Sequence, residues 1–310
     1  MKKIKSLIIG LGNIGMDVDY ENNKKRLSHS STIYHHRKFE LIGGADIKKI
    51  QRKKLEKKYK KKSFKNYLDA IKITKPDLIV ISTPPNTHLE IINNLGNFKK
   101  IILLEKPLSN NFKQAKRIAS LINKKKLNVF INYFREYIPA FINIINTKSK
   151  LYHQCHINYS SSLRENGSHH LSLLINIFDN KKKIINIKSL KKGNKTKDAI
   201  INFSNGEIIL VSNKIKNYEI NNVKIINKNS FTELQLNPIS IKASKIINDS
   251  NFKNGKVLCN IDKYSKKIKD NFFKHVYENI YNYINGKKFY KIPIEKVLRT
   301  EKLIDEIEKV

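Results

Sequence analysis

The sequence has few acidic residues, few cysteines and no tryptophan. Its 310 residues include 26 Asp and Glu against 62 Lys and Arg, and only two cysteines. Cys155 and Cys259 are too few for a disulfide framework, so we expect a reducing, cytoplasmic compartment. The nine histidines and the cysteines lack the spacing of a metal site, so no metal is expected. No run approaches the roughly 18 apolar residues of a membrane span, and we expect no membrane attachment.

The formal net charge of +36 is the kind of excess that nucleic-acid-binding proteins use to neutralise phosphates. Only seven of the 62 basic residues are arginine, and the 55 lysines are spread along the chain among many Asn and Ile residues. Base recognition relies mainly on the bidentate Arg side chain. A codon bias toward A and T accounts for this composition without a nucleic-acid partner. The sequence therefore disfavours nucleic-acid binding.

The first 134 residues alternate between short apolar runs and helical patterns. Strands are predicted over 4–9, 39–45, 78–82, 101–105 and 129–133, and helices over 50–61, 63–73, 88–96 and 111–124. Such alternation is typical of right-handed βαβ units around a parallel sheet. We therefore predict a doubly wound α/β, or Rossmann, domain over residues 1–134.

The pattern changes near residue 151, where strand-like segments follow one another with short polar connections. Strands are predicted over 151–161, 184–190, 198–204, 207–212, 219–226 and 232–236, and helices over 264–284 and 293–307. Ser204-Asn205-Gly206 is a hairpin signal, because Asn-Gly tolerates the positive φ of tight turns. Residues 135–310 are predicted to form an α+β domain on a mostly antiparallel sheet, for substrate binding and oligomerisation, with the C-terminal helices in it.

Three glycines follow the first predicted strand, in the order Gly10-Leu11-Gly12-Asn13-Ile14-Gly15. In a dinucleotide-binding turn the first glycine permits the sharp bend, the second lets the backbone approach a pyrophosphate, and the third allows close packing of helix on strand. Backbone N–H groups then bind the phosphates. The placement favours this interpretation over three glycines in an ordinary turn.

Asp46 ends the second predicted strand, where a carboxylate would accept hydrogen bonds from ribose hydroxyls and repel a 2′-phosphate. It favours NAD, although Lys48 and Lys49 would also serve a 2′-phosphate, so NADP is not excluded. Asp46 lies 36 residues after Gly10, where about 20 is usual. The extra segment, residues 17–37, is expected either to cover the cofactor or to be a solvated excursion.

Several segments, in order along the chain, together resemble the Gfo/Idh/MocA family, the glucose-fructose oxidoreductase and inositol dehydrogenase group. They are Gly10–Gly15, Ser82-Thr-Pro-Pro-Asn86-Thr-His88, Glu105-Lys106-Pro107, Asn132-Tyr133-Phe-Arg135 and Glu165-Asn166-Gly-Ser-His169. The resemblance implies hydride transfer between a nicotinamide and a secondary alcohol or ketone of a sugar, nucleotide-sugar or cyclitol. It also implies a homodimer or homotetramer formed through the open face of the C-terminal sheet.

The resemblance and the strand ends together define the expected cofactor site. Its residues are Gly10, Gly12, Asn13, Ile14, Gly15, Asp46, Ser82, Thr83, Pro84, Asn86, His88, Glu105 and Lys106. Ligands of open α/β sheets bind beyond the carboxyl ends of the strands, and Lys106 directly follows one of them. Its amine is expected to hydrogen-bond the reacting oxygen, whereas a lysine elsewhere would normally be a surface residue.

Family members commonly add an Asp-x-x-x-His pair to the catalytic lysine, and the corresponding pair here is Glu165 and His169. His169 is expected to be the general acid/base, with His170 as its competitor. Glu165 replaces the Asp, and Ser172 stands where many members have another Asp. Substrate contacts are expected from Tyr133, Arg135, Asn166 and His170. The departures leave one alternative open, a non-catalytic NAD(H)-binding sensor or scaffold.

Overall fold

The computed structural model describes residues 3–22, 26–141, 153–178, 184–191, 197–213, 215, 217–236, 239–252, 254–260, 266–267 and 273–310. The chain divides into two compact units. The first unit contains Met1–Pro139 and Asn271–Glu301, and the second contains Ala140–Asp270 and Lys302–Val310. Helix α9, Ile294–Lys309, contains the last boundary.

The first unit is built on a six-stranded parallel sheet with the order β3-β2-β1-β4-β5-β6. Its strands are β1 Ile4–Ile9, β2 Phe39–Ala45, β3 Lys62–Phe64, β4 Leu78–Ile81, β5 Ile101–Leu104 and β6 Asn128–Ile131. Every side chain of β4 and β5 is buried, which explains why these strands are continuous apolar runs. The predicted doubly wound fold is confirmed.

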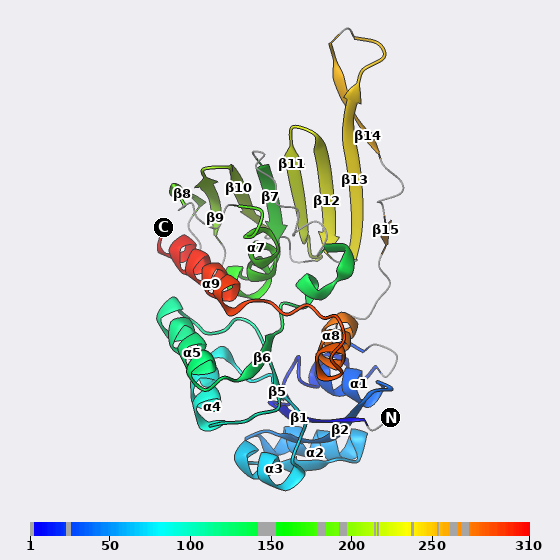
Figure 1. The fold of residues 1–310 in the computed structure, drawn as a ribbon, viewed down its shortest axis with the longest axis vertical. Helices are drawn as coiled ribbons and strands as arrows, with labels where there is room; N and C mark the ends of the chain where they lie inside the picture. Colours follow the sequence, from blue (N-terminus) through cyan, green and yellow to red (C-terminus); the bar gives the residue numbers. More distant parts are fainter. Residues whose placement is uncertain are drawn as a thin grey trace. The chain divides into compact units, whose positions relative to one another are not determined.

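The helices of the first unit begin at residues that the sequence marks clearly. They are α1 His29–Tyr34, α2 Lys49–Tyr59, α3 Tyr67–Thr74, α4 His88–Asn94, α5 Phe112–Lys124 and α8 Lys274–Ile284. Ser28, Asn66 and Asn111 cap α1, α3 and α5 by accepting hydrogen bonds from backbone N–H groups of the first turn. Over β1 and β2, α2 and α3 cover one face of the sheet, and α1 and α8 lie on the other (Figure 1).

One predicted helix, 63–73, was wrong at its beginning. Lys62–Phe64 pairs with Gly43–Ala45 as a parallel edge strand, and the helix begins only at Tyr67, after the Asn66 cap. The three-residue strand is too short to show an apolar period, so a helical pattern that starts at residue 67 was extended backward. The sheet consequently has one more strand than expected.

Helix α8 belongs to the first unit, whereas the sequence analysis assigned residues 135–310, including this helix, to the second domain. Its apolar face, with Val276, Tyr277 and Ile280, is part of the core around the parallel sheet. The ring centroid of Tyr277 lies 5.2 Å from that of Phe39. An apolar face predicts that a helix packs on a hydrophobic core, but it does not predict which domain supplies that core. The domain to which α8 belongs therefore followed only from the tertiary structure.

The second unit contains a nine-stranded sheet with the order β14-β13-β12-β11-β7-β10-β9-β8, and β15 pairs with β13. The strands are β7 His153–Tyr159, β8 Asn186–Lys191, β9 Asp198–Phe203, β10 Gly206–Ser212, β11 Asn222–Asn227, β12 Ser230–Leu236, β13 Ile239–Asn248, β14 Lys256–Asn260 and β15 Lys266–Lys267. All pairs are antiparallel except that of β7 with β10. The predicted mostly antiparallel sheet is confirmed.

Two local predictions for the second unit had different outcomes. The hairpin is present, since Phe203 pairs with Gly206, whose φ is 152°. The helix predicted over 264–284 was wrong at its start, because Lys266–Lys267 is strand β15 and α8 begins at Lys274. Positions 264–265 and 268–272 lie outside the described residues, as do 151–152 of the first predicted strand. Strands β13 and β14 were not predicted.

Candidate functional site

A pocket of about 520 Å³ lies in the first unit at the carboxyl ends of β1, β2 and β4. Open parallel sheets bind dinucleotides at this edge, where the strand order reverses around the first strand. Its lining contains Ile9, Gly10, Gly12, Ala45, Asp46, Ile47, Lys48, Gln51, Lys65, Tyr67, Ser82, Thr83, Pro84, Asn86, Thr87, Glu90 and Ile91. Thus seven of the expected cofactor residues share one pocket: Gly10, Gly12, Asp46, Ser82, Thr83, Pro84 and Asn86.

The glycine loop is closed at two of its glycines and open at the third. Gly10 has φ +91°, and a Cβ there would lie 2.7 Å from the backbone carbon of Ser82. A Cβ at Gly15 would lie 2.1 Å from the carbonyl oxygen of Gly10. A Cβ at Gly12 would have no atom within 4 Å, and Gly12 lines the pocket. The loop therefore offers open backbone where a pyrophosphate would bind.

Asp46 joins the end of β2 to the glycine loop. Its Oδ2 accepts a hydrogen bond from the backbone N–H of Leu11 at 2.7 Å, and its Oδ1 accepts one from that of Lys48 at 2.8 Å. Lys48 and Lys65 also line the pocket. The carboxylate is thus held in the position where it could accept hydrogen bonds from ribose hydroxyls, with two ammonium groups nearby.

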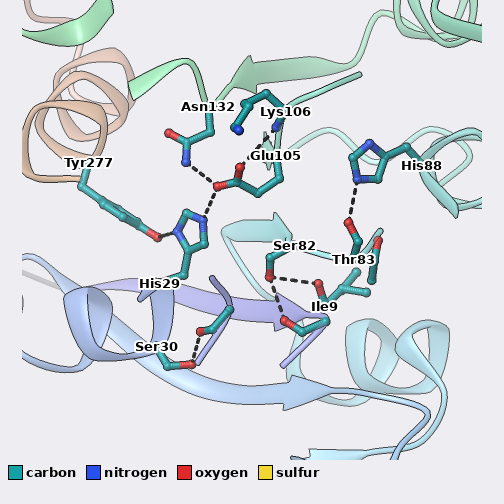
Figure 2. Close-up of polar contacts among 12 residues, drawn as sticks. Ile9, His29, Ser30, Ser82, Thr83, His88, Glu105, Lys106, Asn132 and Tyr277 are labelled. Atoms are coloured by element: carbon teal, nitrogen blue, oxygen red, sulfur yellow. Dashed lines mark hydrogen bonds and ion pairs between the residues drawn. The ribbon is translucent and has the colours of Figure 1, made fainter. Parts of the chain in front are cut away.

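The segment after β4, residues 82–88, forms hydrogen bonds that hold the glycine loop and the segment itself in place. The Ser82 hydroxyl donates to the carbonyl oxygen of Gly10 at 2.7 Å (Figure 2). His88 is fully buried, with its ring nitrogens 3.0 and 3.1 Å from the carbonyl oxygens of Thr83 and Leu108. Burial lowers the pKa of His88, and the two carbonyls partly offset this. The position of His88 is that of a buried support for this segment.

Part of the extra segment 17–37 packs against the glycine loop. The chain leaves the glycine loop and returns to it, since the N–H groups of His29 and Ser30 donate to the carbonyls of Ile14 and Gly15 at 3.0 Å. Asp19 is buried and accepts hydrogen bonds from the N–H groups of Leu27 and Ser28. Helix α1 therefore stacks on the turn that the glycines begin, and its first five residues are buried.

Glu105 and Lys106 follow β5 and lie outside the residues that line the pocket, as do Asn13, Ile14, Gly15 and His88. Glu105 is buried, and its Oε1 lies 2.8 Å from His29 Nε2 and within hydrogen-bonding distance of Asn132 Nδ2. Burial alone would raise the pKa of Glu105, but His29 first, then Asn132 and the Lys106 charge, lower it below the ordinary value. Glu105 is therefore a buried carboxylate beside the half-buried Lys106.

The sequence analysis gave His29 and Tyr277 no role in this site. His29 is in the extra segment, where nothing in the sequence relates it to β5. Asn132 was part of a matched motif without an assigned role, although its place directly after β6 puts it at the same edge of the sheet as Glu105. Only that strand-end position could have indicated the contact.

The structure places two expected substrate residues in the core of the first unit. Tyr133 is fully buried, and its hydroxyl lies 3.5 Å from Oε1 of Glu301, which also accepts from the N–H of Leu108 at 2.7 Å. Arg135 is buried, with its guanidinium carbon 5.1 Å from the centroid of the Phe134 ring. Substrate contacts by these two residues stay predictions.

The other expected catalytic residues are in the second unit, where Leu163–Gly167 forms a π-helical turn that continues into α7, Ser168–Leu174. Glu165 is exposed, whereas His169 is buried. His170 is fully buried and its Nδ1 lies 2.6 Å from the carbonyl oxygen of Asn166. That contact engages one ring nitrogen of His170 with the preceding turn. Π-helical turns often occur at functional sites, which fits the expected role of this segment.

Two further observations apply to the described part of the chain. It contains no cluster of three or more His, Cys, Asp or Glu residues that could hold a metal ion. It also contains no helix long and apolar enough to cross a membrane.

Residues 4–133 match the model of the Gfo/Idh/MocA family, described as an oxidoreductase family with an NAD-binding Rossmann fold. This stretch contains the glycine loop, Asp46 and the Glu105-Lys106 pair. This part of the chain is thus similar to the NAD-binding domain of the Gfo/Idh/MocA family. The predicted resemblance and the predicted NAD-binding domain are therefore confirmed over these residues.

Known proteins resemble this chain in sequence over a short stretch and in fold over nearly the whole chain. The rhizopine catabolism protein MocA of Rhizobium meliloti is 28% identical over 78 residues, which is 25% of this chain and 25% of that protein. The UDP-N-acetylglucosamine 3-dehydrogenase GnnA from Acidithiobacillus ferrooxidans has a TM-score of 0.75 at 12% identity, covering 100% of this chain and 98% of its own. KijD10, a 3-ketoreductase from Actinomadura kijaniata studied as a mutant with TDP-benzene and NADP, has a TM-score of 0.72 at 12% identity, covering 99% and 98%. At these identities the structures establish the fold alone.

Proposed function

We propose that this protein is an NAD-dependent oxidoreductase of the Gfo/Idh/MocA type that moves hydride between the nicotinamide and a secondary alcohol or ketone of a sugar, nucleotide-sugar or cyclitol. The observation that carries this proposal is the pocket in which the Asp46 carboxylate and the open side of Gly12 both lie. A carboxylate for the ribose and free backbone for the pyrophosphate are the two features that a dinucleotide needs.

The cofactor preference rests on one charge. The Asp46 carboxylate, held by two backbone N–H groups, would repel the 2′-phosphate of NADP. Lys48 and Lys65 line the same pocket and would partly offset that repulsion. KijD10 was solved with NADP, so that cofactor occurs on this fold. We expect tighter binding of NADH, with measurable binding of NADPH.

The chain supplies the proton and charge handling that hydride transfer needs. When bound, the nicotinamide cofactor accepts or donates the hydride. Lys106 is proposed to donate a hydrogen bond to the reacting oxygen and to stabilise the charge that develops there. His169 is proposed, on the family resemblance of residues 165–169, as the general base that takes the hydroxyl proton in oxidation and returns it in reduction.

The substrate class is supported by the basic surface and by the neighbours. An excess of lysine is compatible with the diphosphate of a nucleotide-linked sugar. GnnA and KijD10 are both named for chemistry at position 3, on a UDP-sugar in GnnA and beside a TDP ligand in KijD10. We therefore place UDP- and TDP-linked sugars first in a panel that also contains free sugars and cyclitols.

The test begins with fluorescence titration of NADH and NADPH, followed by NADH production or consumption across that panel. We expect turnover of at least one panel member, and Lys106→Ala and His169→Ala should each lower kcat by about 10²- to 10⁴-fold. Lys113→Ala on α5 and His156→Ala on β7 are matched controls in the same two units, and both should retain activity.

Two results would contradict the proposal in different ways. Cofactor binding without turnover of any panel member would support the sensor or scaffold alternative. Turnover that is unchanged in both Lys106→Ala and His169→Ala would reject the assigned catalytic residues.

A further inference from the structure

Side chains from four separate parts of the first unit meet around the Glu105 carboxylate (Figure 2). His29 is the first residue of α1, Glu105 follows β5, Asn132 follows β6, and Tyr277 is in α8. His29 Nε2 lies 2.8 Å from Glu105 Oε1, and His29 Nδ1 lies 2.8 Å from the Tyr277 hydroxyl. The result is a continuous buried chain of polar groups from α8 to the carboxyl end of β5.

The His29 ring forms polar contacts through both nitrogens and stacks on an aromatic ring through one face. It is fully buried and stacks on Phe273, with ring centroids 4.3 Å apart and planes 1° from parallel. Its main-chain N–H bonds the carbonyl of Ile14, and the next residue, Ser30, bonds the carbonyl of Gly15 through both its N–H and its hydroxyl. The position of the imidazole is thus tied directly to the glycine loop.

The buried Glu105 carboxylate fixes the direction of its hydrogen bond with His29. A buried carboxylate needs donors, since an unpaired buried charge is costly. The Nε2–H of His29 therefore donates to Glu105, and Nδ1 pairs with the hydroxyl of Tyr277. Burial raises the pKa of Tyr277 well above its ordinary value, so this hydroxyl keeps its proton.

Glu105 in turn borders the proposed catalytic lysine. Its Oε2 accepts a hydrogen bond from the main-chain N–H of Lys106 at 3.2 Å. The charge of Lys106 also contributes to the lowered pKa of Glu105, after His29 and Asn132 and against the effect of burial. Any change in the charge or position of Glu105 is therefore felt both by the backbone and by the ammonium group of Lys106.

We propose that His29 is a positioning residue for Lys106: anchored by Tyr277, Phe273 and the glycine loop, it keeps Glu105 charged and in place, and Glu105 fixes the main chain and the electrostatic surroundings of Lys106. This inference rests on the proposed function only in its consequence for turnover. The extra segment 17–37 then has a function, because it contains the histidine that links the glycine loop to the end of β5.

The test compares His29→Leu, which removes the donor to Glu105, with His29→Gln, whose side-chain amide keeps a donor. Glu105→Gln removes the charge itself, and Tyr277→Phe removes only the outer hydrogen bond. The first readout needs no substrate: the rate at which an amine-reactive ester acylates Lys106, followed by peptide mass spectrometry. NADH affinity and the thermal midpoint report on folding, and kcat and KM are measured with any substrate that the wild type turns over.

We expect Lys106 to be acylated several-fold faster in both His29→Leu and Glu105→Gln. Glu105→Gln removes the charge that favours the ammonium form of Lys106, and His29→Leu removes the donor that keeps Glu105 charged and in place. His29→Gln should return toward the wild-type rate, and Tyr277→Phe should lie between. In kcat, His29→Leu should lose about ten- to a hundredfold, as when an outer partner of a functional group is removed, with KM nearly unchanged. A merely structural role would affect Leu and Gln equally and would leave the acylation rate of Lys106 unchanged.

The inference is overturned if His29→Leu and Glu105→Gln show the wild-type acylation rate, or if His29→Gln is as impaired as His29→Leu. Should His29→Leu fail to fold, Glu105→Gln and the comparison of His29→Gln with Tyr277→Phe still decide it. If the acylation rates follow the expected order while no panel member is turned over, the proposed function fails and the positioning of Lys106 by His29 stands.

Discussion

Gly12 and Gly15 are separated by only two residues, yet they carry opposite constraints. Gly15 is required by the fold, since a Cβ there would lie 2.1 Å from a backbone oxygen. Gly12 lines the pocket and has open space where a Cβ would lie, so we propose that its constraint comes from the ligand. The sequence shows the same residue, glycine, at both positions. Only the surrounding structure distinguishes the glycine required by packing from the one proposed to be required by the ligand.

This difference predicts opposite outcomes for two alanine substitutions. Gly12→Ala should unfold at the wild-type temperature, because it meets no atom within 4 Å, but should bind NADH at least about tenfold more weakly. Gly15→Ala should be destabilised by about 1–3 kcal/mol, as expected for overpacking against backbone. Thermal unfolding and NADH titration of the two variants check this. A Gly12→Ala protein with wild-type NADH affinity would argue against pyrophosphate binding at the loop.

At the scale of elements, the connection between α1 and β2 contains His36, a partly buried histidine whose pKa is lowered. The Nδ1 of His36 accepts a hydrogen bond from the N–H of Lys38 at 3.1 Å, and its ring lies 4.9 Å from that of Phe39. Burial, followed by the charges of Lys38, Arg26 and Lys3, lowers the pKa of His36 from 6.5 to about 4. The folded protein therefore favours the neutral ring.

The sign of this shift predicts acid sensitivity. Because the pKa of His36 is about 4 in the folded protein and ordinarily 6.5, the unfolded chain binds the extra proton first. The contribution to stability is complete above pH 6.5 and is lost as the pH falls toward 4. His36→Gln, which keeps a neutral acceptor, should flatten the decrease in the free energy of unfolding over this range. Urea denaturation at several pH values measures it, and identical pH slopes for both proteins would reject the assignment.

The elements also show which sequence signals predicted structure. Strands β4 and β5 were predicted within one residue, because every side chain is buried and each run is uninterruptedly apolar. The strand Lys62–Phe64 was mistaken for the start of a helix, and β13 and β14 were missed. A three-residue strand such as Lys62–Phe64 is too short to show a periodic pattern. In β14, Val257 and Leu258 are 41% and 55% exposed, so the apolar residues of this strand do not form a buried face.

For the whole molecule, the second unit offers the surface on which we propose that copies of the chain associate. Helix α7 lies on one face of its sheet, and the β13–β14 hairpin extends beyond the other strands (Figure 1). This hairpin exposes apolar side chains, with Ile247 46% and Phe252 71% exposed. Exposed apolar clusters of this kind commonly mark interfaces.

We predict a homodimer or homotetramer formed through this sheet, measured by light scattering after size-exclusion chromatography. Ile247→Asp should shift the mass toward that of a single chain, because it places a charge on the proposed interface. Ile50→Asp on α2, at a residue 64% exposed, is the matched control and should leave the mass unchanged. A single-chain mass for the wild type would refute the proposed assembly.

The sequence by itself determined the parallel sheet, the antiparallel sheet and the glycine loop, because these depend on local periodicity and on residues a few positions apart. Seven of the expected cofactor residues share one pocket for the same reason: strand ends of a parallel sheet meet at one edge. Only the tertiary structure decided that α8 packs on the first unit, that Tyr133 is in its core, and that His29 meets Glu105 across 76 positions of the chain. Such contacts result from which apolar faces cover one another and which buried charge needs a donor, and neither requirement leaves a pattern along the chain.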